Sequence, residues 1–351
     1  MAILLDDGKK QYKANLHAHS TESDGKLSVN ELTVKYKAEG YSVLAITDHE
    51  TPLRHSDLST DDFLLLDGYE AYIRPSSKCI FNRFKPEIHL NLIAKSQSNK
   101  EEWMEAGHLP YLGYNFFYTK YFDKKSAKKL DVARKLKRRR FTTHFINSFI
   151  ECAHDAGYFV FLNHPYWSMM EQKELFELNG IDSVEIFNYS SMLVNDDEGD
   201  VKFYDSLLRH NKRTYIIKKD DKKPFCHGSD DNHNSNKEID DSFGAFTYIL
   251  ADSLDYDSIS KAIEKGDYYA STGPRIKKIE ISGNNAHIWT DDCKSIIMHV
   301  TPKFSCRKYS KDDEPLNEAV FKIPGSCNFV YFSVRDKEGK RAVTRYYDVK
   351  H

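Results

Sequence analysis

Several features that would direct a chain to a membrane, to nucleic acid or to an oxidising compartment are missing from this sequence. No apolar run approaches the ~20 residues that a membrane-spanning helix needs. The formal net charge is only -2, which predicts no general attraction to nucleic acid or to anionic membranes. The six cysteines form no C-x-x-C pair, so we expect reduced thiols. Since the first residues also turn acidic too early for a secretory signal, we expect a cytoplasmic protein without membrane partners.

The composition is that of an ordinary globular enzyme. Hydrophobic residues make up 40% of the 351 positions and charged residues 30%. A chain of this length can form one large α/β domain or two smaller domains.

Residues 1–275 read as alternating strands and helices. Ser28 followed by Glu31 is a capping-box pattern that predicts a helix ending at Gly40. Apolar runs lie on both sides of this helix, so we expect a βαβ unit with two parallel strands. Further apolar runs each end in, or lead to, His, Asp or Glu, as in α/β barrels whose catalytic residues follow the strands; these runs are 63–73, 88–95, 158–163, 181–188 and 224–229.

The pattern changes after a predicted helix, glycine stop and loop at 258–274. Residues 276–351 alternate apolar and polar side chains between Gly, Asn and Asp turns, which is typical of antiparallel strands. We therefore predict a catalytic domain at 1–275 and a small β-rich module at 276–351.

The strand ends carry an unusual number of metal-ligand side chains. His17 and His19 are two residues apart, so on a strand they point to the same side, and Asp24 on the next turn can reach them. An isolated His-x-His pair is equally well explained as surface residues of an edge strand, but the other strand ends add imidazoles and carboxylates. The complete candidate set is His17, His19, Asp24, His49, Glu70, His89, His164, Asp231 and His233. Because one four- to six-coordinate ion cannot use nine ligands, we expect two or three ions, with Glu70 as a bridging carboxylate.

These motifs resemble a known family. "HAHSTESDG", "TDHE", the Glu of "GYE", "NHP" and the Asp-x-His of "DDNH" are similar to the PHP (polymerase and histidinol phosphatase) domain, and "AIEKGDYYASTGPRI" is similar to the segment that closes it. The resemblance implies a distorted (β/α)7 barrel, a trinuclear metal cluster held by the nine residues above, and hydrolysis of phosphoesters. Many relatives have His in place of Asp24, although the Asp form also occurs. The D-x-H spacing favours Asp231 over Asp230 as the ligand, which leaves Asp230 and Asp48 to hold ligating imidazoles by their other N–H.

Such a cluster would hydrolyse a phosphoester without a protein nucleophile. Divalent ions neutralise the growing charge on the phosphoryl oxygens and lower the pKa of a bound water, which becomes the attacking group. His164 or His233 can instead protonate the leaving group, although a ligand cannot also play that role. Mixed N/O ligation suits Mn, Fe and Zn equally, and nucleotides, sugar phosphates, amino-acid phosphates and cyclic phosphodiesters all fit as small-molecule substrates.

Other readings of the same residues stay open. An amidohydrolase would attack a C–N bond at the same cluster, a PHP-type exonuclease would act on nucleic acid, and a scaffold would bind metal without catalysis. The basic run 124–140 is either a solvated helix face or a phosphate-binding element through one or two of its arginines, which are Arg134, Arg138, Arg139 and Arg140. Glu185 is a candidate pocket residue or a structural acceptor, and Tyr166 with Trp167 is either a stacking wall for an organic leaving group or core.

Overall fold

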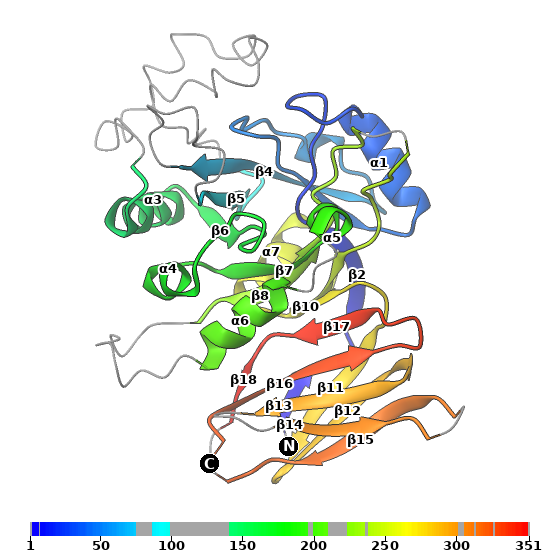
Figure 1. Cartoon of the computed structure of the whole chain (residues 1–351). Helices are drawn as coiled ribbons and strands as arrows, with labels where there is room; N and C mark the ends of the chain where they lie inside the picture. Colours follow the sequence, from blue (N-terminus) through cyan, green and yellow to red (C-terminus); the bar gives the residue numbers. More distant parts are fainter. Residues whose placement is uncertain are drawn as a thin grey trace.

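The computed structural model describes residues 2–6, 8–74, 86–98, 140–195, 199–209, 223–235, 238–300, 305–311, 314–325 and 327–349. Over these residues the chain forms a mixed α/β fold with one large mixed sheet and a second, four-stranded sheet (Figure 1). Helices flank the large sheet in the N-terminal three quarters of the chain, whereas the C-terminal part is made of strands.

The fold begins with the predicted βαβ unit. Helix α1 (Val29–Ala38) has the expected capping box, in which the Ser28 N–H donates to the Glu31 carboxylate at 2.8 Å and Glu31 N donates back to the Ser28 hydroxyl. Gly40 follows the helix at φ +74°, a conformation that glycine adopts without strain. Strands β2 (Lys10–Asn15) and β3 (Val43–Ile46) pair in parallel, as expected.

The central strands do not all run in the same direction. Parallel pairs join β3 to β4, β6 to β7 and β7 to β8, but β5 is antiparallel to both β4 and β6. The bounds are β4 Leu64–Ile73, β5 Ile88–Ala94, β6 Tyr158–Leu162, β7 Ser183–Asn188 and β8 Phe225–Ser229. The helices among them are α3 (Thr143–Asp155), α4 (Gln172–Glu177), α5 (Tyr189–Asn195) and α6 (Gly199–Arg209), with a 3-10 turn η1 at Ser56–Leu58.

The closed seven-fold barrel that the motifs imply is not seen among the described strands. The sheet order is β10-β9-β2-β3-β4-β5-β6-β7-β8, and β9 (Phe246–Ala251) pairs antiparallel with β2. The segment after β8 nevertheless returns to the segment after β2: Asp231 N donates to His17 O at 3.0 Å, and His19 N donates to Asn232 O at 3.1 Å. Both ends of this part of the sheet therefore meet at one place.

The C-terminal strands are antiparallel throughout, as the alternating pattern predicts. They follow helix α7 (Tyr256–Lys265) and strand β10 (Tyr268–Ser271), and are β11 Ile276–Ser282, β12 Asn285–Cys293, β13 Ser295–Val300, β14 Ser305–Tyr309, β15 Leu316–Lys322, β16 Phe329–Arg335, β17 Arg341–Thr344 and β18 Tyr347–Asp348. Two strand pairings join residues on opposite sides of the predicted boundary at residue 275: β1 (Ala2–Leu5) pairs with β11, and β17 pairs with β10. Residues 276–351 are thus joined to residues 1–275 by backbone hydrogen bonds.

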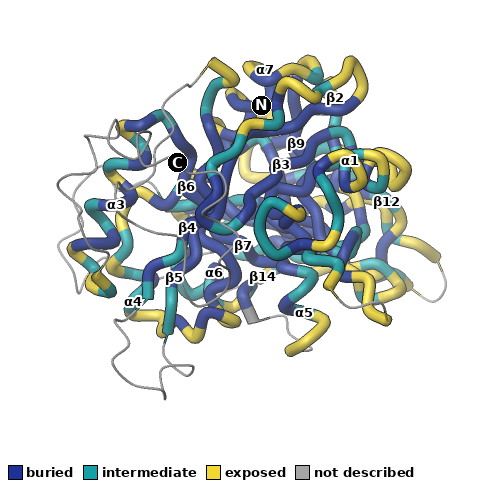
Figure 2. Tube along the Cα trace, turned by 90° about the horizontal axis from the view of Figure 1, so that it is seen from above, coloured by how far each residue is buried: buried dark blue, intermediate teal, exposed yellow. Residues whose placement is uncertain are grey.

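The buried residues lie mainly on the strands. In Figure 2 the strands β3, β4, β6 and β7 are buried along most of their length, while exposed positions occur on α1, α7 and the turns. Every residue of β3, β5, β6, β7 and β8 is buried. A close-packed set of strands holds its ends in fixed positions, which is what a multi-ligand site requires. None of the helices in the described part of the chain has the length and apolar character needed to cross a bilayer.

Candidate metal centre

The candidate ligands gather at one edge of the large sheet. His17 and His19 follow β2, His49 follows β3, His164 follows β6, and Asp231 with His233 follows β8. Asp24 lies in the turn after His19. These residues reach the same place because the parallel strands all end at this edge.

Glu70 and His89 reach this edge by a different route. Glu70 lies within β4, where it forms a bridge with His49, and His89 is the second residue of β5. Because β5 is antiparallel to β4, its beginning lies at the edge where the parallel strands end, and His89 pairs with Tyr72. The nine predicted ligands are therefore all brought together.

The site has a buried floor and a more open rim. The floor is formed by His17, His19, Glu70 and His164, each at most 2% exposed, whereas Asp24, His49 and His233 are half-buried. An imidazole or a carboxylate placed in such a floor must be paired or bound to a metal to offset its desolvation.

A first donor group joins three buried side chains. The Nε2 atoms of His17 and His19 are 3.2 Å apart, and Oδ1 of Asp231 lies 3.1 Å from the first and 2.9 Å from the second. Four ligands arranged as a tetrahedron around an ion at about 2.1 Å are themselves about 3.4 Å apart. Two imidazole nitrogens and a carboxylate oxygen at this spacing fit a divalent cation.

A second group forms around the carboxylate of Glu70. Its Oε2 lies 2.8 Å from His49 Nδ1 and its Oε1 lies 3.0 Å from His89 Nδ1. Oε1 is also 3.4 Å from His17 Nε2 and 3.5 Å from His164 Nε2. Glu70 therefore has imidazole nitrogens on several sides of its carboxylate, as the expected bridging carboxylate would need.

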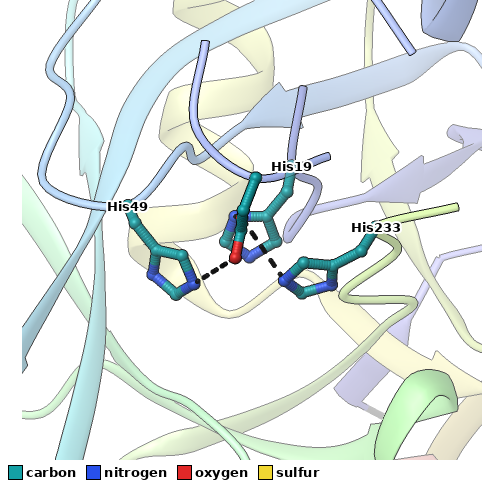
Figure 3. A group of neighbouring side chains, drawn as sticks. His19, His49 and His233 are labelled. Carbon is teal, nitrogen blue, oxygen red and sulfur yellow. Dashed lines mark ion pairs between the residues drawn. The ribbon is translucent and has the colours of Figure 1, made fainter. Parts of the chain in front are cut away.

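A third group joins the buried His19 to the half-buried His49 and His233, and the three rings point toward one another (Figure 3). Asp24 belongs to the same group. Oδ1 of Asp24 is 3.6 Å from His233 Nε2 and 3.8 Å from His19 Nδ1, and Oδ2 is 3.7 Å from His49 Nε2. The donor sets at the three groups are mixed nitrogen and oxygen, which fits divalent transition metals.

Outer partners hold the imidazoles by their second nitrogens. His17 Nδ1 lies 3.1 Å from Glu185 Oε1, His89 Nε2 lies 3.3 Å from Glu87 Oε1, and His164 Nδ1 lies 3.1 Å from Ser168 Oγ. Partners of this kind fix the orientation and the tautomer of a ligating ring and make it a stronger ligand. Glu87 was missed in the sequence, although it precedes His89 by two residues and so shares its side of an extended segment.

Two residues that were candidates for the pocket, Glu185 and Tyr166, do not line the cavity. Glu185 is fully buried and does not line the cavity: its Oε2 accepts hydrogen bonds from His164 N and Asn188 Nδ2 at 3.0 and 2.9 Å. Its side chain points from β7 toward the interior and His17, and one of its oxygens lies within 4.8 Å of donor nitrogens of His17 and His164. Tyr166 is 48% exposed and is absent from the cavity lining, which its neighbour Trp167 joins instead.

The carboxylates of Asp48 and Asp230 accept hydrogen bonds from backbone N–H and hydroxyl groups instead of from imidazoles. Asp48 accepts hydrogen bonds from Ser20 N and Oγ, both at 2.7 Å, and from the Ser23 hydroxyl. Asp230 accepts from the Tyr36 hydroxyl and from the backbone N–H groups of residues 243–245. In the described part of the chain neither aspartate bonds a candidate ligand ring directly. Asp48 reaches His19 only through the Ser23 hydroxyl, which lies 3.4 Å from His19 Nδ1, whereas Asp230 is occupied by loop N–H groups and Tyr36.

Charge in the site is strongly coupled. Burial opposes ionisation of Glu70, but the neighbouring His17, His89 and His49 outweigh it and hold the pKa of this carboxyl well below its usual value. Burial likewise disfavours the charged form of His89, yet Glu70 and Glu87 raise its pKa to about 10. Burial is the main cause that raises the pKa of Asp230 to about 7. The cluster is therefore a concentration of negative charge that protons or metal cations must balance.

A cavity of about 340 Å³ opens directly above the donors. Beyond the ligands its wall includes Tyr72, Arg74, Trp167 and Val194. Arg74 is the one Lys or Arg among the lining residues that the structure describes. Of the arginines considered for phosphate binding, Arg134, Arg138 and Arg139 lie outside the described residues, and Arg140 is exposed and does not line the cavity. The volume is that of a pocket for a small organic molecule.

Comparison with known proteins gave similarity to solved structures alone. No family model matches the sequence, and no curated protein matches it. A two-domain protein from Bacteroides vulgatus, containing a predicted PHP-like metal-dependent phosphoesterase, is 14% identical with a TM-score of 0.38, over 100% of this chain and 91% of that chain. A protein from Bifidobacterium adolescentis, named as a metal-dependent phosphoesterase, is 15% identical with a TM-score of 0.39, over 73% and 96%. An amidohydrolase from Chromobacterium violaceum, with sulfate bound and no metal, is 14% identical with a TM-score of 0.38, over 63% and 87%. Two of these proteins are named as metal-dependent phosphoesterases, and the name of the Bacteroides vulgatus protein also contains the family name PHP.

Proposed function

We propose that this protein is a metal-dependent phosphoesterase that hydrolyses small-molecule phosphomonoesters or phosphodiesters at a site of two to three divalent ions. The observation that carries the proposal is the convergence of nine nitrogen and oxygen donors around Glu70, directly below a cavity whose wall contains Arg74. The proposal includes a distorted PHP-type α/β barrel within residues 1–275 as the catalytic unit.

The donors are arranged to hold ions in two or three positions. His17, His19 and Asp231 would hold one, His49, Glu70 and His89 a second, and the rim residues Asp24 and His233 a third. When bound, such ions neutralise charge on phosphoryl oxygens and lower the pKa of water toward neutrality.

The chain itself fixes which nitrogen of His233 faces the site. Its Nδ1 lies 2.9 Å from the backbone oxygen of Asp231, which can only accept a hydrogen bond. The proton of a neutral ring therefore sits on Nδ1, and Nε2 presents a lone pair toward Asp24. This tautomer supports a ligand role for His233.

Other side chains would bind and orient the substrate. Arg74 carries a guanidinium whose planar donors match the oxygens of a phosphoryl group. A phosphoester offers several non-bridging oxygens to a multi-ion site, whereas an amide offers a single carbonyl oxygen. This difference supports phosphoester over C–N hydrolysis as the reaction.

The test is hydrolysis by protein reconstituted with Mn, Fe and Zn in turn. p-Nitrophenyl phosphate, bis-p-nitrophenyl phosphate and p-nitroacetanilide separate monoester, diester and amide cleavage. We expect phosphoester cleavage that is lost in Asp231→Asn and kept in Asp291→Asn, an aspartate of β12 paired with Lys277 away from the cavity. Anilide cleavage without ester cleavage would identify an amidohydrolase, and no cleavage by the loaded protein would contradict the hydrolase proposal.

A further inference from the structure

Trp167 lies next to the candidate metal ligands, and much of its indole is exposed to solvent. The side chain is 42% exposed, although Trp is among the largest apolar residues. Its ring centroid lies 4.9 Å from that of His164 and 5.6 Å from that of His89, at interplanar angles of 75° and 72°. The indole is thus packed nearly perpendicular to two candidate ligands, an arrangement that aromatic pairs favour.

The backbone around Trp167 is held in a tight turn. Ser168 N donates to His164 O at 3.0 Å, Met169 N donates to Tyr166 O at 2.9 Å, and Met170 N donates to Pro165 O at 3.0 Å. The Ser168 hydroxyl also contacts His164 Nδ1. The indole is therefore positioned by the same turn that positions a ligand, so its place relative to the metal site is set before any substrate binds.

The neighbouring wall of the cavity is also aromatic and apolar. Tyr72 and Val194 line it together with Trp167, and Val194 is 71% exposed. The cavity therefore has polar donors at its floor and, at its side, a flat aromatic surface in contact with the rings of His164 and His89. A ligand that fits both has an anionic group joined through a short linkage to a planar ring.

We propose that Trp167 is the stacking surface for the leaving group, so that the preferred substrates are phosphoesters of alcohols that carry an aromatic ring next to the ester bond. This inference rests on the proposed function, since the phosphoryl group must lie over the donors for the ring to reach the indole. Stacking recognises any flat π-system, so the preference is for aromatic over saturated groups of similar size.

The test compares benzyl phosphate with cyclohexylmethyl phosphate. The two esters have leaving alcohols of similar acidity and size and differ in the flatness of the ring. We expect a lower KM for the benzyl ester with the metal-loaded protein. Trp167→Leu should raise that KM roughly five- to tenfold and change the KM of the cyclohexylmethyl ester less than twofold, while Trp167→Phe keeps the preference. Trp289→Leu, on β12 outside the cavity lining, is the matched control and should behave as the parent protein.

A binding measurement separates this inference from the proposed function. Benzylphosphonate and cyclohexylmethylphosphonate are not hydrolysed, and calorimetric titration gives their affinities for the metal-loaded protein directly. A benzyl preference that Trp167→Leu removes supports the stacking surface even when neither phosphate ester is cleaved, and only the proposed function then fails. Equal binding of the two phosphonates, or a preference unchanged by Trp167→Leu, overturns the stacking surface.

Discussion

The carboxylate of Glu185 lies 3.1 Å from Nδ1 of His17, and neither side chain is exposed to solvent. The other nitrogen of His17 faces the carboxylates of Asp231 and Glu70. A residue of β7 thereby sets the orientation of a candidate ligand that follows β2. The precision of the site thus depends on contacts between strands distant in the sequence.

The first prediction follows from this pair. Glu185→Gln removes the negative charge that orients His17 and strengthens it as a ligand, so metal affinity should fall by roughly 10- to 100-fold. Affinity is measured by competition with a chromophoric chelator, and circular dichroism checks the fold. The control is Glu318→Gln, whose carboxylate lies 3.0 Å from His287 on the C-terminal strands. Affinities of the two variants that agree within twofold would contradict the role of Glu185.

The second prediction separates two adjacent aspartates. Asp231 Oδ1 lies within 3.1 Å of the Nε2 atoms of both His17 and His19, so Asp231→Asn should lose one bound ion per chain. Asp230 instead accepts loop N–H groups, so Asp230→Asn should keep the ions and lower the free energy of unfolding by about 1–3 kcal/mol. Elemental analysis and urea denaturation read out the two effects. The assignment is wrong if the two results are exchanged.

The third prediction concerns metal removal. Five carboxylates, those of Asp24, Glu70, Glu87, Glu185 and Asp231, lie in contact with the six imidazoles of the cluster. Ions that bind the folded chain stabilise it by about 4 kcal/mol when present at 1,000 times their Kd, so chelation should lower Tm by roughly 5 °C or more. Differential scanning calorimetry with and without EDTA measures the shift. A Tm that does not respond to chelation or to added Mn, Fe or Zn would mean that this cluster binds none of them in solution.

Local signals predicted the elements better than their partners. Ser28, Glu31 and Gly40 all lie at the ends of α1, so both limits of the helix could be predicted from neighbouring residues in the sequence. The direction of β5 could not, because an apolar run pairs equally well with a parallel or an antiparallel neighbour. Fourteen residues separate Ile73 from Ile88, a length that allows either a tight return or a crossover. The pairing of β1 with β11 joins residues nearly 280 positions apart and leaves no local pattern.

The candidate ligands could be identified because their chemistry is uncommon at strand ends. His89 was found by residue type, although it begins its strand instead of ending it. The outer partners were harder to predict. Glu185 and Ser168 contact His17 and His164 only because their side chains point toward these rings, and that direction depends on how other parts of the chain pack. The same is true of Tyr166 and Trp167, where the turn after His164 exposes both rings but puts only the second at the cavity.

The last prediction concerns His227 on β8, whose burial lowers its pKa to about 4. The ring is fully buried against Phe161 and lies 2.9 Å from the Ser183 hydroxyl through Nδ1. Glu185 on β7 raises this pKa and His17 after β2 lowers it, but burial dominates. His227 is therefore protonated below about pH 6.5 in the unfolded chain but only below about pH 4 in the folded chain. The stability that His227 contributes is complete above pH 6.5 and is lost as the pH falls toward 4.

His227→Asn removes this titration while keeping a polar group near Ser183. The free energy of unfolding of the parent protein, minus that of the variant, should decrease by about 2 kcal/mol between pH 7.5 and pH 5. Urea denaturation of both proteins in EDTA keeps metal loss out of the comparison, and the ligands common to both proteins cancel in the difference. Parallel pH profiles for the two proteins would show that His227 accepts its proton in the folded state as readily as in the unfolded chain.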